Sequence, residues 1–130
     1  QVLDLDLNEN INCILIRTQP NECSDKLKDW SGTNPPFIHH EAMQVLVDFG
    51  IEHFMIDLPS VDRENDEGKL LAHKTFWNYP SKKVRENTTI TEMIYANREL
   101  KDGLFLVNIQ VLPIALDASP SNVVLFKILK

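Results

Sequence analysis

Residues 39–58, HHEAMQVLVDFGIEHFMIDL, constrain the fold most, because their hydrophobic period changes in the middle. In the first half, apolar side chains recur on one face of a helix, and Gly50 follows at a point where helices often end. The second half, residues 51–58, has the length and apolar character of a buried strand. A helix that leads directly into such a strand predicts an α/β fold. The apolar helical face consists of Ala42, Met43, Leu46 and Val47.

Further segments with strand or helix periodicity lie on both sides of this unit. Residues 2–7 alternate between apolar and acidic side chains, which predicts a strand with one wet face. Residues 11–17 predict a strand buried on both faces, and the two strands could pair as a hairpin. A second helix fits within residues 66–80, and strands fit within residues 88–96, 103–116 and 122–130. We therefore predict one α/β domain over residues 1–130, with a mixed sheet and two or three helices.

Composition narrows the classes of function. Of the 130 residues, 43% are hydrophobic and 25% are charged, which is usual for a soluble domain, and no apolar run approaches the ~20 residues that cross a bilayer. The net charge of −6 comes without a basic stripe, so we do not expect nucleic acid as a partner. Cys13 and Cys23 form no disulfide or metal motif, so we expect a cytoplasmic setting. The chain opens in strand alternation without a signal peptide, which suggests a piece of a longer protein.

Four histidines are the first candidates for metal or proton chemistry. His39 and His40 lie where the first helix should begin, which favours an exposed position, and His53 falls in a strand as an edge or core residue. His73 differs, because its helical face should pack on the sheet, where a polar ring needs a partner. From the residues alone, a bond to a backbone carbonyl is favoured over a metal-binding or proton-carrying role. The same helical face carries Leu70, Phe76 and Trp77.

Glu92 raises a similar question. In an extended segment it would share a face with Ile90 and Ile94, where a carboxylate needs a partner or a metal. Alternatively, Thr89 and Glu92 form a capping box at the start of a helix, and both alternatives stay open. An imidazole and a carboxylate suit zinc, but a catalytic zinc normally has about three protein ligands. Further ligands would have to come from His39, His40, Asp57, Asp62 or outside the chain.

Other chemistries find little support in the sequence. Residues 58–62, LPSVD, lack the glycines of a nucleophile elbow around Ser60, and no phosphate loop or dinucleotide fingerprint occurs. The acidic side chains that follow are expected to form a solvated loop and helix start, where carboxylates suit the helix dipole. They are Asp62, Glu64, Asp66 and Glu67.

Five stretches, read in order, carry a resemblance to a known family. They are CILIRT, SGTNPPFIHHEAMQVLVDFGIEHFMIDLPSVD, LLAHKTFW, ITEMI and LPIALDASPSNVVLF. Together they resemble the C-terminal half of the cyclase, or kynurenine-formamidase-like, family of metal-dependent hydrolases, over nearly all of residues 11–128. The resemblance implies a swivelling β/β/α fold and hydrolysis of an amide, such as a formamide, or of a lactone.

The resemblance also implies particular residues and partners. His73 and Glu92 match metal ligands of the family, and Asp57 and Ser60 match a turn that shapes the substrate site. The ion implied is zinc, with manganese as the alternative, in a mononuclear or binuclear site. No catalytic residue is implied in this chain. A homo-oligomer and a small-molecule substrate are the implied partners.

Two departures from the family pattern change what we expect. The signature His-x-Gly-Thr-His-x-Asp-x-Pro-x-His does not occur here, so we expect the metal to bind only when an N-terminal half is present as a partner. Leu58 stands where many relatives have threonine, which puts a substrate contact at that position in doubt. The competing hypothesis is a binding or oligomerisation module that has neither a metal nor catalysis.

Overall fold

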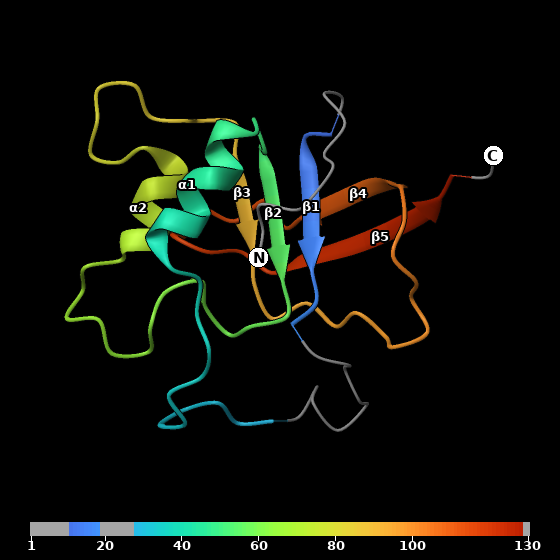
Figure 1. Cartoon of the computed structure of the whole chain (residues 1–130), viewed down its shortest axis with the longest axis horizontal. Coiled ribbons are helices and arrows are strands. Elements are labelled where there is room, and N and C mark those ends of the chain that lie inside the picture. The colour runs from blue at the N-terminus through green and yellow to red at the C-terminus, as the bar shows by residue number, and fades with distance from the viewer. Residues whose placement is uncertain (1–10, 19–27, 129–130) are drawn as a thin grey trace.

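The computed structural model describes residues 11–18 and 28–128, which contain two α-helices and five β-strands (Figure 1). Their order along the chain confirms the predicted α/β class. Two expectations lie outside the described residues: the strand at residues 2–7, with its pairing to residues 11–17, and the position of Cys23. The elements are β1 (Cys13–Ile16), α1 (His40–Asp48), β2 (His53–Ile56), α2 (Leu71–Trp77), β3 (Thr89–Thr91), β4 (Phe105–Val111) and β5 (Ser121–Lys127).

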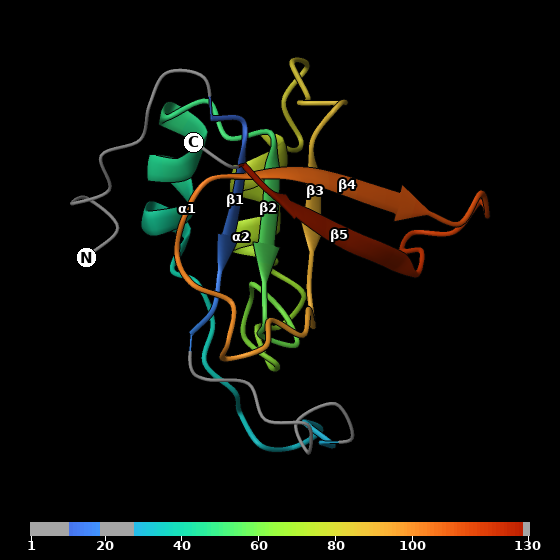
Figure 2. The same ribbon diagram turned by 90° about the vertical axis from the view of Figure 1, so that its right-hand side faces the viewer.

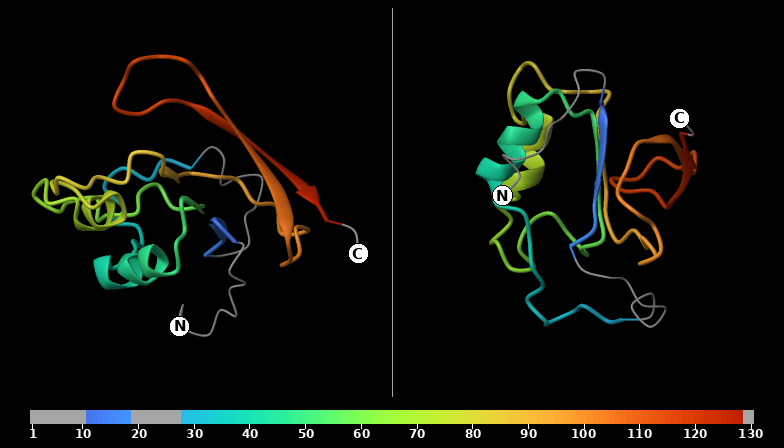
Figure 3. Two further views of the ribbon diagram at one scale, coloured as in Figure 1. Left: turned by 90° about the horizontal axis from the view of Figure 1, so that it is seen from above. Right: turned by 45° about the vertical axis from the view of Figure 1, so that its right-hand side comes forward.

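The strands form two separate sheets rather than one mixed sheet. β2 lies between β1 and β3 in a parallel sheet, in which Phe54 pairs with Ile14 on one side and Ile90 on the other. β4 and β5 form an antiparallel hairpin in which Val107 pairs with Leu125. The two helices cover one face of the parallel sheet, and the hairpin lies on the opposite side (Figures 2 and 3). Neither helix among the described residues is long and apolar enough to span a membrane.

The main core lies between the parallel sheet and the two helices. Met43 on α1, Phe54 on β2 and Phe76 on α2 are fully buried in it, and the Phe54 and Phe76 ring centroids lie 6.4 Å apart. Burying each such side chain contributes roughly 1.5–3 kcal/mol to folding. Met55 points to the opposite face of β2 and is also fully buried. The central strand is therefore covered on both faces, as parallel strands usually are.

The described helices and strands fall at the predicted places but several are shorter than predicted: β3 covers only Thr89–Thr91 of residues 88–96, and β4 covers Phe105–Val111 of residues 103–116. The ends of the helices have local causes. α1 ends at Asp48 with Phe49 as its C-cap residue, and Gly50 follows with a φ of 79°, as its sequence position predicted. α2 ends at Trp77, and its C-cap residue, Asn78, has a left-handed φ of 53°. The segment after α2 is held against the helix by Arg85, whose guanidinium donates to the carbonyl oxygens of Phe76 at 2.7 Å and Ile51 at 2.6 Å.

Two expectations about acidic residues were wrong. Asp62 is not solvated: it is 6% exposed, because its carboxylate turns inward to the start of α2. Glu92 lies neither within a strand nor in a capping box. β3 ends at Thr91, and Met93 adopts a φ of 55°, which turns the chain out of the ladder and places Glu92 just beyond the strand.

Candidate metal centre

His73 lies between two carboxylates. Its Nδ1 is 2.7 Å from Oδ2 of Asp62, and its Nε2 is 3.4 Å from Oε1 of Glu92. The side chains are 17% exposed for His73, 7% for Asp62 and 26% for Glu92. The ring also contacts Trp77, with centroids 5.2 Å apart. The structure thus brings together the two residues that the family resemblance singled out as metal ligands.

The Asp62 side chain is held in place by hydrogen bonds from the first amides of α2. The N-cap residue of this helix, Leu70, makes no side-chain cap hydrogen bond, so the first amides need another acceptor. Asp62 supplies it: Oδ1 accepts from the Ala72 amide at 2.7 Å, and Oδ2 accepts from the His73 amide at 3.2 Å. A negative charge at this end of a helix is favoured by the helix dipole. One buried carboxylate therefore caps the helix and binds the imidazole ring.

Glu92 is tied to the same turn from the other side. Its Oε1 accepts a hydrogen bond of 2.7 Å from the amide of Val61, the neighbour of Asp62. The next residue, Met93, donates its amide to the carbonyl oxygen of Leu58 at 2.8 Å. The turn after β2 therefore sets the positions of both carboxylates that flank the ring.

The electrostatics of the ring reflect these neighbours. Burial lowers the pKa of His73, but the hydrogen bonds and negative charges of Glu92 and Asp62 outweigh it and raise that pKa above its ordinary value. A protonated ring can donate to both carboxylates at once. A neutral ring that donates from Nδ1 to Asp62 instead presents the Nε2 lone pair on the side of Glu92, as in metal sites where a carboxylate orients the ligand histidine.

The donor pair fits a divalent ion in type and spacing. Zinc binds imidazole nitrogen and carboxylate oxygen at ~2.0–2.2 Å, and two such donors on a tetrahedral ion lie about 3.4 Å apart. The observed separation of Nε2 of His73 and Oε1 of Glu92 is 3.4 Å. Among the described residues the centre offers these two donors, and Oε1 of Glu92 also accepts from the Val61 amide. Both oxygens of Asp62 face the start of α2, and one of them also binds Nδ1.

The other predicted site residues lie at the carboxyl end of β2. Both carboxylate oxygens of Asp57 accept from the amide of Thr18, at 2.9 and 3.0 Å, which ties the chain after β1 to the end of β2. Ser60 Oγ accepts from the amide of Asp62 at 3.2 Å. Ser60 therefore belongs to the turn that builds the centre, and Asp57 lies where that turn begins.

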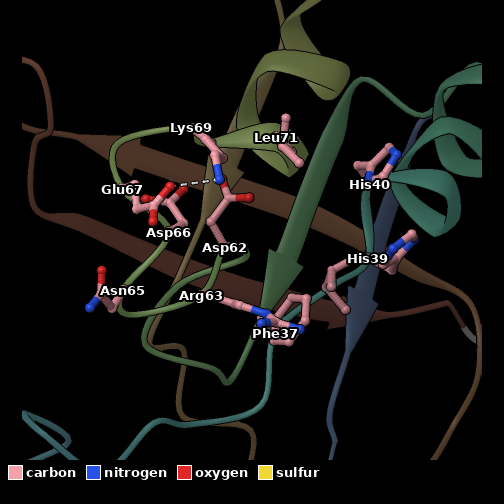
Figure 4. Close-up of a pocket in the computed structure, with 11 residues that line it drawn as sticks. Phe37, His39, His40, Asp62, Arg63, Asn65, Asp66, Glu67, Lys69 and Leu71 are labelled. Atoms are coloured by element: carbon pink, nitrogen blue, oxygen red, sulfur yellow. Dashed lines mark ion pairs between the residues drawn. The ribbon is translucent and has the colours of Figure 1, made fainter.

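His39 and His40 do not join His73 but form a group of their own with Glu41. One ligand atom from each of the three residues lies within 4.8 Å of the others, so they could hold a metal ion. His39 and His40 border an open pocket of about 410 Å³, whose wall also includes Asp62 (Figure 4). Asp62 is thus the side chain that the pocket and the His73 centre share.

Asp62 has a larger part in the centre than its place in the sequence indicated. It was expected as one of several further ligands and as part of a solvated loop, whereas in the structure it is the partner of His73. The predicted helix range, residues 66–80, begins at Asp66, itself a usual cap residue. It therefore did not show that Leu70 is the N-cap residue of α2, or that the first amides of this helix need an acceptor from elsewhere.

Comparisons with known proteins support the fold. No family model matches the chain. No curated protein matches it either. Among solved structures, it is similar to a predicted metal-dependent hydrolase from Bacillus stearothermophilus, with a TM-score of 0.55 and 20% sequence identity. The match covers 78% of this chain and 45% of that one, so this chain spans less than half of that protein. At this identity, the likeness concerns the fold.

Proposed function

We propose that this chain is part of a metal-dependent hydrolase, in which His73 and Glu92 are two of the ligands of a divalent ion. The observation that carries the proposal is the 3.4 Å separation of Nε2 of His73 and Oε1 of Glu92, on a ring whose Nδ1 is fixed by Asp62. The fold shared with a protein described as a metal-dependent hydrolase agrees with it. So does the resemblance to the kynurenine-formamidase-like family.

The residues of this chain have separate roles in the proposal. His73 and Glu92 hold the ion, and Asp62 keeps the proton on Nδ1, so that Nε2 is the free donor. When bound, the ion lowers the pKa of a water from ~15.7 toward ~7 and polarises a carbonyl group. The family resemblance favours an amide, such as a formamide, or a lactone as substrate, and zinc or manganese as the ion. The remaining ligands would come from an N-terminal half.

Asp57 and Ser60 are proposed to shape the substrate side of the centre through the turn after β2. Both accept backbone hydrogen bonds there, so their contribution is to hold the turn in place. Leu58, which replaces the threonine of many relatives, is 3% exposed and packs in the core. The substitution therefore adds apolar packing at the point where a hydroxyl would otherwise lie.

The test compares metal content and hydrolysis in the protein encoded by the complete reading frame. Zinc is measured after dialysis, and a formanilide substrate reports amide hydrolysis. His73→Ala and Glu92→Gln should each lose most of both. His53→Ala is the matched control, because His53 is half-buried in the same sheet and its Nδ1 lies 3.0 Å from Thr89 Oγ1. A full-length protein that takes up no zinc or manganese would overturn the proposal.

A second candidate function, association without catalysis, is favoured by the hairpin. Leu106 and Phe126 pair across β4 and β5 and are 65% and 53% exposed. β4 carries no charged residue, and exposed edges of that kind favour pairing with another chain. A second copy of the chain would then cover the hairpin. Light scattering tests this function: Leu106→Lys should reduce the associated mass, and an unchanged mass would contradict it.

A further inference from the structure

We propose that His39, His40 and Glu41 form a second site for a divalent transition-metal ion, open to solvent and separate from the His73 centre. The site does not rest on the proposed hydrolase function. A nitrogen from each imidazole and a carboxylate oxygen lie within 4.8 Å of one another. The two rings lie 4.4 Å apart between centroids, with their planes tilted by 36°. Two imidazoles and one carboxylate are a ligand set that suits zinc, nickel and copper ions.

The three side chains converge because α1 begins among them. Consecutive residues within a helix point about 100° apart, so three neighbours would normally diverge. His39 is instead the N-cap residue, with an extended backbone at φ −66° and ψ 139°. Its Nδ1 accepts a long hydrogen bond of 3.4 Å from the Glu41 amide and lies 3.6 Å from the Glu41 carboxylate. This change of backbone direction turns His39 over the first turn of the helix.

The surroundings leave these donors available. Within the described parts of the chain, the ring of His40 makes no hydrogen bond, and its ring contact is with His39. The bond from the Glu41 amide to His39 is long, so a metal could displace it at little cost. The side chains of His39 and Glu41 are 58% and 82% exposed, which allows water to complete the coordination.

The charges around His39, His40 and Glu41 have opposing effects on a bound cation. The positive end of the α1 dipole disfavours a cation, and the Glu41 carboxylate opposes that effect. Both histidines border the 410 Å³ pocket, whose wall includes the carboxylates of Asp62 and Asp66 (Figure 4). The net charge of −6 adds a general attraction for cations. We therefore expect an accessible, rapidly exchanging site that a chelator empties easily.

Titration calorimetry with NiCl₂ on the whole chain tests the site. The variant His73→Ala/Glu92→Gln should still bind about one equivalent of Ni²⁺, because the second site is intact. His39→Ala/His40→Ala should weaken that binding by about tenfold or more, and Glu41→Gln by less. His53→Ala is the control for loss of a histidine elsewhere. Unchanged Ni²⁺ affinity in His39→Ala/His40→Ala would overturn the second site. Loss of Ni²⁺ binding in His73→Ala/Glu92→Gln would be a separate result, which supports the first centre.

A second measurement keeps the test decisive if a variant folds poorly. Substoichiometric Cu²⁺ added to the unmodified chain should give an electron paramagnetic resonance spectrum with coupling to imidazole nitrogens. In nuclear magnetic resonance spectra, it should broaden the amide signals of residues 39–41 before those of residues 72–74. Broadening that begins at residues 72–74 would place the ion at the His73 centre and overturn the second site.

Discussion

Asp62 holds His73 at two points: its Oδ2 lies 2.7 Å from the ring Nδ1 and accepts a hydrogen bond of 3.2 Å from the His73 amide. The backbone and the side chain of one residue are thereby fixed by one buried carboxylate. Helix formation and ring orientation therefore depend on the same group, and a change at Asp62 should affect both.

Replacing Asp62 tests this dependence. Asp62→Ala should lower the free energy of unfolding by about 2 kcal/mol, because it removes the acceptor for two helix amides and leaves a polar ring without its partner. Urea unfolding followed by circular dichroism measures the change. Glu67→Gln is the control, since Glu67 forms an exposed ion pair with Lys69 and should matter by less than about 0.5 kcal/mol. Equal effects from the two variants would contradict the role of Asp62.

The raised pKa of His73 predicts a pH dependence in protein freed of metal by a chelator. The group is more easily protonated in the folded state than in the unfolded chain, where its pKa is near 6.5. Its stabilising contribution is therefore complete below that value and is lost as pH rises through the folded pKa. The stability difference between the unmodified chain and His73→Gln should therefore shrink over the pH range above about 6.5. A difference that grows over this range would show that burial, and not the two carboxylates, dominates.

Phe76 should be the most sensitive side chain of α2, because it is fully buried against Phe54. Phe76→Ala should cost about 3–5 kcal/mol, through lost burial and the cavity that it leaves. The unfolding midpoint in urea reports this loss. Phe49→Ala, at a residue that is 45% exposed, is the matched control and should cost far less.

Burial raises the pKa of the Cys13 thiol to about 11. Because the thiolate is the reactive form, Cys13 should react with iodoacetamide at least about tenfold more slowly in the folded protein than in urea at the same pH. Mass spectrometry of a Cys23→Ser variant follows this residue alone. Equal rates in the two conditions would mean that β1 opens readily.

Local patterns predicted much of the fold, and contacts between distant segments account for what they missed. The helical face at Met43 and Leu46 repeats every three or four residues, so the sequence alone reveals it. The partner of His73 cannot be found in this way, because Asp62 lies 11 residues away and reaches it only after the turn has formed. Glu92 was also misplaced, since the left-handed Met93 that ends β3 has no periodic signature. The pairing of His73 with Glu92 came from the family resemblance, and their metal-binding role remains a prediction.

Two backbone amides that donate to the carboxylates of the His73 centre can report on its state by hydrogen–deuterium exchange. The Val61 amide donates to Glu92, and the Ala72 amide donates to Asp62. Each N–H can exchange with deuterium only when its hydrogen bond to the carboxylate is broken. The two exchange rates therefore report separately how often the Glu92 bond and the Asp62 bond open. An ion captured by Glu92 would draw charge away from the Val61 bond and leave the Ala72 bond in place. A ratio of two exchange rates would then distinguish an occupied centre from an empty one without any assay of turnover.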